Sequence, residues 1–332
     1  MQKRNLNIQC LRGICALVVF FSHALNIYNI SWVQDLMSTP WHFFFDGQWA
    51  VVVFFALSGY YYYTERELTF SSYLKGLKKK ALKIYPPHLI ILGIGCILIM
   101  SYTSHDIFPN RDSVTKWAAQ FWMQPVGIKE LIGNATVLLP HNFDAINPPS
   151  WYLMAEVKMF IVMPLFVALV KRTSWVLAFA VFLVCWLVEI PFVSCIGSYV
   201  AGALLHKYIN RIEISAKFYI FILAVGVVLL DIRNFGISFM PHSNNTYVLM
   251  TQCIGALCIL YVCNSLRKDI SNKVLLYFGN ISYEFYITHF IVLMGLTPWI
   301  INPTSLIIVS FILTVCIAHI LNIGTRKIIE KL

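Results

Sequence analysis

Two ionisable residues interrupt an apolar segment near the start of the chain. Arg12 and His23 lie in CLRGICALVVFFSHALNIY, residues 10–28. At about 100° per residue, their spacing returns to within about 20° of one helix face, with a rise of roughly 16 Å. Imidazole exchanges protons near neutral pH and guanidinium binds anions. The pair predicts proton transfer at one depth and anion binding at another. The plainer alternatives are a snorkelling Arg12 and a hydrogen-bonded packing role for His23.

Further ionisable residues lie in other apolar segments. Counted from the outer ends of their segments, Glu156 and His23 lie at similar depth, which would allow them to meet. His289 lies somewhat deeper. Lys158 is two positions from Glu156 and therefore points to another helix face. A structural ion pair or hydrogen-bonded pair is the alternative for Glu156.

A basic stretch, LKGLKKKALKIYPP, precedes one of the apolar segments. It carries Lys75, Lys78, Lys79, Lys80 and Lys83. Such a cluster sets topology and attracts anionic lipid. It can also bind a phosphate-bearing ligand from the cytoplasm.

The composition defines the class of protein. The 332 residues are 59% hydrophobic and 12% charged, with a mean hydropathy of +0.71. Apolar runs long enough to cross a hydrocarbon layer as helices recur about ten times. We therefore predict an all-α polytopic membrane helix bundle. Its expected spans are 8–28, 47–63, 83–101, 150–170, 173–190, 191–208, 216–231, 246–263, 279–297 and 304–323.

The distribution of charge predicts the topology. With the N-terminus in the cytoplasm, the inner segments hold 19 of the 25 Lys and Arg residues and the outer loops hold four. This asymmetry predicts that both termini are cytoplasmic. The net charge of +10 thus needs no nucleic-acid partner. The cysteines form no CxxC pair and no Cys/His cluster, which argues against a metal site.

The chain is expected to form a single membrane-embedded domain over residues 1–332, without a fused soluble domain or a cleaved signal. Its longest predicted connection is the outer loop 102–149. Trp117, Phe121 and Trp122 in this loop have helical spacing, which predicts a short helix at the membrane interface. The end of the loop, PHNFDAINPPSWY, either lines an outward-facing site or simply ends the connection.

Five stretches, in order, resemble the signature of the acyltransferase-3 family of integral membrane O-acyltransferases. The first is the pair Arg12 and His23, which matches an arginine, ten residues and a histidine. The others are FFALSGYYY (54–62), KKALKIYP (79–86), SWYLMAEVKMFIVMPLF (150–166) and GNISYEFYITHFIVL (279–293). Two departures are Lys80 and Lys83 in place of arginines, and Glu284 where a small or neutral residue is common.

The resemblance implies transfer of an acyl group, expected to be acetyl, from cytoplasmic acetyl-CoA to a hydroxyl of a glycan. The expected acceptor is a lipid-linked or cell-surface polysaccharide such as O-antigen, and the expected location is the bacterial inner membrane. No metal is expected. The implied catalytic residues are His23, Glu156 and Arg12; CoA would contact Arg12, Lys79, Lys80 and Lys83; the substrate would contact Ser150, Trp151, Tyr283 and His289.

The sequence leaves two roles open for His23 and two other classes open for the protein. His23 can act as a general base or carry the acyl group transiently. A glycolipid transporter or flippase, or a non-catalytic component of a polysaccharide export system, also needs many helices with buried charges. These rivals predict no CoA dependence or a tolerance for loss of His23.

Overall fold

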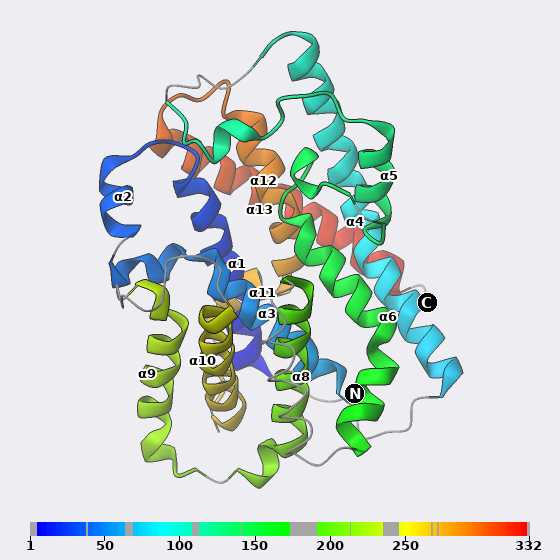
Figure 1. Cartoon of the computed structure of the whole chain (residues 1–332), viewed down its shortest axis with the longest axis vertical. Coiled ribbons are helices and arrows are strands. Elements are labelled where there is room, and N and C mark those ends of the chain that lie inside the picture. Colours follow the sequence, from blue (N-terminus) through cyan, green and yellow to red (C-terminus); the bar gives the residue numbers. More distant parts are fainter. Residues whose placement is uncertain are drawn as a thin grey trace. The chain divides into compact units, whose positions relative to one another are not determined.

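The protein is helical throughout the part that is described. The computed structural model describes residues 5–330 except 38, 64–68, 108–112, 140, 173–190, 213, 235–245, 267 and 271. Within these ranges the regular elements are α-helices and 3₁₀ helices, and strands are absent (Figure 1). An isolated bridge joins Tyr28 to Val114. The predicted all-α polytopic class is confirmed.

Nearly all predicted spans coincide with helices. The long helices are α1 Leu6–Leu25, α3 Gly47–Tyr62, α4 Phe70–Ser104, α6 Ser150–Arg172, α8 Pro191–Tyr208, α9 Tyr219–Leu230, α10 Thr246–Ser265, α12 Ser282–Leu296 and α13 Pro303–Glu330. Shorter ones are α2 Ser31–Met37, α5 Ile128–Thr136 and α11 Lys273–Asn280. The predicted span 173–190 lies outside the described residues. The predicted span 279–297 begins with a break, because α11 ends at Asn280 and α12 starts at Ser282.

Length and hydropathy identify membrane spans among the described helices. Four of them, α1, α4, α10 and α13, are long and apolar enough to cross a membrane. Helix α6 adds a fifth if its two segments, separated near Pro164, are counted as one span. The remaining apolar helices are shorter, so the count of ten spans stays a prediction, as does the orientation.

Backbone contacts divide the chain into two compact units. Unit 1 comprises Met1–Val18, Asp35–Thr69 and Met159–Gly279. Unit 2 comprises Val19–Gln34, Phe70–Lys158 and Asn280–Leu332. Helices α1 and α6 each contribute to both units. The expected organisation as one domain is neither supported nor contradicted by this division.

In unit 1, glycines let helices α3 and α8 touch through their backbones. A Cβ on Gly59 would overlap the carbonyl oxygen of Tyr199, and a Cβ on Gly202 would overlap that of Ala56. Small residues at helix crossings allow this close approach, which favours association in an apolar medium. The glycine of the FFALSGYYY stretch is thus explained by packing.

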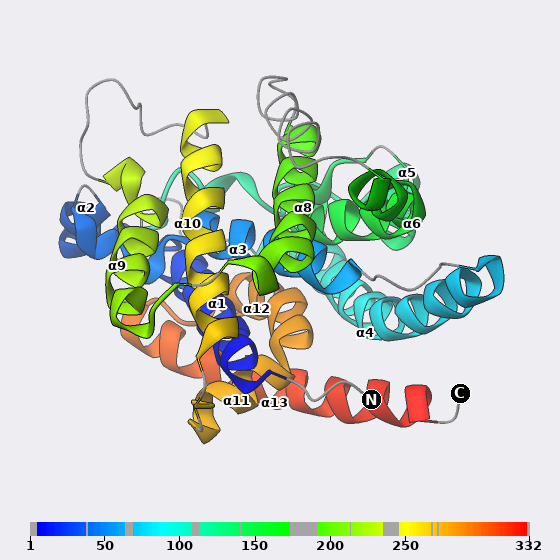
Figure 2. The same ribbon diagram turned by 90° about the horizontal axis from the view of Figure 1, so that it is seen from below.

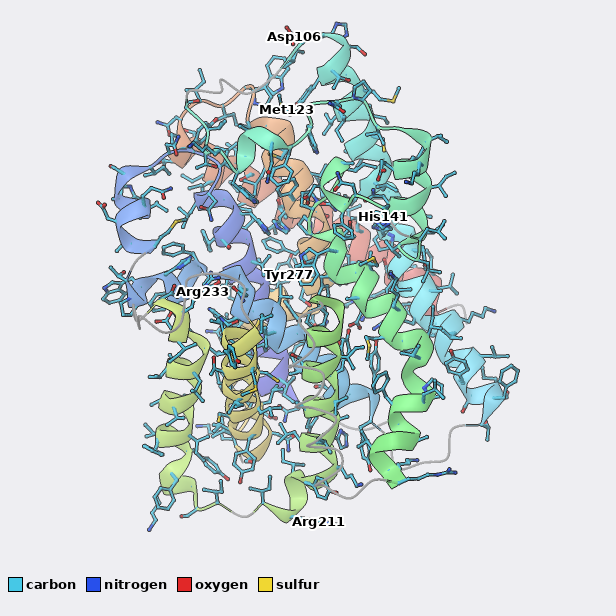
Figure 3. The ribbon with its side chains drawn as sticks, in the orientation of Figure 1. Asp106, Met123, His141, Arg211, Arg233 and Tyr277 are labelled. Atoms are coloured by element: carbon cyan, nitrogen blue, oxygen red, sulfur yellow. The ribbon has the colours of Figure 1, made fainter. Side chains whose placement is uncertain are left out.

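Unit 1 also holds a buried ion pair at the start of α3. Asp46 is the N-cap of this helix, and its Oδ1 accepts a hydrogen bond from Gln48 N at 2.9 Å. Arg233, labelled in Figure 3, donates from Nη2 to the same oxygen at 2.6 Å. The cap satisfies a helix N-terminus that would otherwise leave unpaired N–H groups in an apolar region.

Unit 2 is built around α12, which packs against α13 and α4 (Figure 2). Ser282 and the eleven consecutive side chains from Glu284 to Met294 of α12 are buried, and Tyr283 between them is partly exposed. Asn322 of α13 donates from Nδ2 to Asn280 O at 3.2 Å. Tyr102 of α4 donates to Gly295 O. Helix α12 is therefore surrounded by protein within its own unit.

The outer loop 102–149 packs inward, contrary to the predicted interfacial helix. Around Trp117, Phe121 and Trp122 the backbone forms a 3₁₀ turn, Ala118–Gln120, and Trp122 has a left-handed φ of 59°. The side chains of Phe121 and Trp122 are buried. Trp122 Nε1 donates to Ile146 O at 2.9 Å. The helix predicted from Trp117, Phe121 and Trp122 was wrong, because the rings of Phe121 and Trp122 pack inside the protein around a tight turn.

The loop is attached to the end of α1 and to α12. Thr115 N donates to Ile27 O at 2.9 Å, and Asn29 Nδ2 donates to Val114 O at 3.0 Å. At the other end of the loop, Asn147 Nδ2 donates to Ile287 O at 3.0 Å. These bonds hold the loop beside the residues that carry the candidate site.

Candidate active site

His23 lies near the C-terminal end of α1 and pairs with a second histidine. His23 Nδ1 and His289 Nε2 are 2.8 Å apart. His289 comes from α12 and is 0% exposed, whereas His23 is partly exposed. The two imidazoles belong to unit 2 and are separated by 266 residues in sequence. A proton shared between the rings leaves His23 Nε2 as the nitrogen that faces away from the pair.

Aromatic rings fix the plane of His23. Trp117 from the outer loop stacks on it, with ring centroids 5.6 Å apart and an angle of 16° between planes. Phe290 approaches edge-on, at 5.8 Å and 83°. Phe121 packs in turn against Phe290 at 5.2 Å. The hydrogen bond to His289 and the ring contacts with Trp117 and Phe290 thus fix the orientation of the imidazole. A group that transfers protons requires such a fixed orientation.

The Nε2 atom of His23 has no hydrogen-bond partner among the described residues. The His23 side chain is partly exposed, which leaves room for a substrate group beside this nitrogen. A neutral imidazole whose Nδ1 carries the proton presents a lone pair at Nε2. The arrangement can therefore accept a proton from a hydroxyl group placed against His23.

A second polar pair lies between α4 and α6. Lys80 Nζ and Glu156 Oε1 are 2.6 Å apart, with side-chain exposures of 25% and 8%. Ile84 follows Lys80 by one helical turn, and its carbonyl oxygen accepts a hydrogen bond from Tyr283 Oη at 2.8 Å. Leu153 and Val157 of α6 form an apolar cluster with Ile84 and Val137. The ion pair therefore sits at the edge of a packed helix junction.

The depths predicted for Glu156 and Lys80 cannot both be right. A direct ion pair places Glu156 and Lys80 at one depth, although the first was predicted in the outer third and the second at the cytoplasmic mouth. Residue counting failed because α6 starts at Ser150, which is 1% exposed and whose Oγ lies 3.4 Å from Asn134 Oδ1. A helix that begins inside the protein gives no measure of distance from the membrane surface.

Comparison with family models gives a match over nearly the whole chain. The model described as Acyltransferase domain, that of the acyltransferase-3 family, covers residues 5–323. The chain belongs to the acyltransferase-3 family. Comparisons with curated proteins and with solved structures found no significant match. The protein is thus a membrane acyltransferase, and its apolar helices agree with an integral membrane location.

The residues of the acyltransferase that were predicted to contact CoA differ in their exposure to solvent. Lys79 and Lys83 are exposed on α4, whereas Lys80 is partly buried and pairs with Glu156. Arg12 lies on α1 within unit 1 and is partly buried. The contact of these four residues with CoA stays a prediction.

The predicted substrate contacts of the acyltransferase also differ from one another. Trp151 is 37% exposed, whereas Ser150 is buried. Tyr283 is bonded to a backbone carbonyl of α4. His289 is enclosed behind His23. Only Trp151 among them presents a large open surface, and the substrate role of all four stays a prediction.

Two features of the site were missed at the sequence level. The depth estimates placed His23 and His289 within a few residues of each other, but their pairing was not drawn from them. Trp117 was assigned to the interface rather than to the imidazole. Glu284, for which the sequence offered no explanation, is buried in the first turn of α12, where the positive end of the helix dipole favours a carboxylate. Among the described residues, no cluster of three His, Cys, Asp or Glu could bind a metal ion.

Proposed function

We propose that this acyltransferase moves an acetyl group from cytoplasmic acetyl-CoA to a hydroxyl of a lipid-linked glycan or surface polysaccharide of the O-antigen type, in the bacterial inner membrane. The observation that carries the proposal is the imidazole of His23, held through Nδ1 and by Trp117, with Nε2 open. Acyl transfer to a hydroxyl needs a base at the acceptor, and in this proposal His23 supplies it.

In the proposed reaction, His23 Nε2 takes the proton of the acceptor hydroxyl as its oxygen attacks the thioester carbonyl. The new C–O bond forms, the C–S bond breaks, and the CoA sulfur leaves with the proton that His23 received. The alternative route places the acetyl group on His23 Nε2 before the hydroxyl attacks. Both routes need the same open nitrogen.

The proposed donor path follows α1. Arg12 and His23 lie on this one continuous helix, separated by a rise of roughly 16 Å. CoA is too highly charged to cross hydrocarbon, but its pantetheine arm is about as long as that rise. The phosphates would therefore remain near Arg12, while the thioester reaches His23. Glu156 has no direct part in this proposal, because its carboxylate is paired with Lys80.

The test uses purified full-length protein with acetyl-labelled CoA and candidate glycans. We expect label in the glycan with the parent protein and with His319→Ala, a control on the exposed part of α13. With His23→Ala we expect none above background. Transfer that survives His23→Ala at the parental rate would exclude His23 as the base. Glycolipid movement without CoA dependence would instead support the transporter or flippase reading, and a protein inactive in both assays would support the export component.

A further inference from the structure

The two histidines of the pair have different surroundings, although their rings make one hydrogen bond. His289 is 0% exposed and packs beside Phe20, with ring centroids 6.4 Å apart. Its Nε2 is occupied by His23, and its Nδ1 is buried without a regular hydrogen bond. A substrate hydroxyl thus has no access to either nitrogen of His289 while His23 is in place. The pair contains one residue that can meet a substrate and one that cannot.

The chemistry of the pair depends on which ring donates the shared proton. If His23 Nδ1–H donates to His289 Nε2, then His23 Nε2 carries a lone pair and can accept a proton. If His289 donates instead, His23 Nε2 already bears hydrogen and cannot act as a base. Only the first arrangement fits the proposed reaction.

The neighbours of His289 favour the first arrangement. The carbonyl groups of Phe285 and Tyr286, one turn earlier on α12, interact with the His289 ring. Carbonyl oxygens are acceptors, so they favour a proton on the nitrogen that does not face His23, which is Nδ1. His289 Nε2 then has a free lone pair and accepts from His23. In this arrangement a neutral imidazole does for His23 what a carboxylate does for the histidine of a catalytic triad.

We propose that His289 is a positioning residue, which holds His23 with its proton on Nδ1 so that Nε2 is the reacting nitrogen. This inference rests on the proposed function, since it concerns the base of that reaction. It replaces the substrate-binding role that the sequence suggested for His289. Trp117 completes the support by fixing the plane of the same ring.

The test compares two substitutions of His289 in the purified full-length acyltransferase. In His289→Gln the amide oxygen reaches about the position of Nε2 and can accept from His23 Nδ1. In His289→Leu no acceptor remains. We expect kcat to fall about 100-fold or more in His289→Leu, the scale of general-base catalysis. We expect His289→Gln to recover at least about tenfold of that loss, with KM for acetyl-CoA and for the glycan within about twofold of the parent.

His88 provides a matched control. It is also a buried histidine of unit 2, and its Nε2 lies 2.8 Å from Asn134 O. We expect His88→Gln to leave kcat unchanged. Should His289→Leu fail to fold, His289→Asn replaces it, because its shorter amide does not reach His23 and keeps the site polar.

The outcomes separate this inference from the proposed function. Parental kcat in His289→Leu, with His23→Ala inactive, would overturn the positioning role alone. A raised KM for the glycan with unchanged kcat would overturn it too, because it would make His289 a substrate contact. Parental activity of His23→Ala would instead overturn the proposed function.

Discussion

Unit 2 contains two polar pairs, His23 with His289 and Lys80 with Glu156. They are arranged alike but differ in charge. In each, a buried partner lies behind one that is partly exposed: His289 behind His23, and Glu156 behind Lys80. The ion pair joins full opposite charges at 2.6 Å, so each partner satisfies the other. The histidine pair shares one proton and leaves His23 Nε2 open. The difference teaches that intramembrane polarity by itself does not separate a candidate catalytic residue from a structural pair.

The comparison also redistributes the predicted roles. The charge of Lys80 is balanced by Glu156 within the protein, which makes Lys80 less suited than the exposed Lys79 to bind a phosphate. Breaking a buried pair leaves an uncompensated charge, whereas removing both partners often costs little. We therefore expect the histidine pair to respond in activity and the ion pair to respond in stability.

The largest effect is expected from His23→Asn. The Asn amide lies near the former Nδ1 and can keep a hydrogen bond with His289, but it has no basic nitrogen. We expect kcat to fall about 1,000-fold, within the range for loss of a general base. Thermal unfolding of the detergent-solubilised protein should occur within a few degrees of the parent. An unstable but active His23→Asn would reverse the assignment, since it would make the histidine pair the structural one.

The next effect is expected from Lys80→Met, which removes the ammonium group that lies 2.6 Å from the Glu156 carboxylate. Since Lys80 is partly exposed, we expect a loss of about 2 kcal/mol in unfolding free energy, below the range for fully buried pairs. The double variant Lys80→Met/Glu156→Met should regain most of this loss. Urea or thermal unfolding of the four proteins measures the coupling. Strictly additive losses would show that the ion pair does not hold the helices together.

A smaller effect is expected from Trp117→Leu, which removes the stacked ring from His23 while keeping an apolar side chain. A ring face stabilises an adjacent cation by roughly 1 kcal/mol, so loss of Trp117 should lower kcat about fivefold. Trp117→Phe should lose less. Initial rates at saturating acetyl-CoA measure this. Unchanged kcat in both variants would mean that the hydrogen bond to His289 alone orients the imidazole.

The smallest effect is expected from Lys80→Arg, which restores the arginine found in the family pattern. The charge is kept, and the guanidinium can still pair with Glu156. We expect the thermal unfolding midpoint to stay within a few degrees of the parent. We expect the KM for acetyl-CoA to stay within about twofold. A KM several-fold lower would indicate that position 80 contacts CoA phosphate after all, contrary to its role as a holding residue.

Much of the fold could be predicted because local chemistry determines it. A run of apolar residues with few charges must form a helix in a membrane, since each backbone group needs an internal partner. The expected spans 150–170 and 304–323 accordingly fall within α6 and α13. The ends were less predictable. Helix α1 stops at Leu25 rather than at 28, because Tyr28 is drawn into a bridge with Val114 of the outer loop.

The sequence by itself determined the helical class and the family, and it singled out His23 as the residue to examine. Periodicity and composition act over neighbouring residues, and they carry that information. Tertiary structure alone decided the partners: His289 and Trp117 for His23, and Lys80 for Glu156. Those contacts join segments from 76 to 266 residues apart. They are set by how helices cross and how the outer loop folds inward, and local sequence patterns do not encode either.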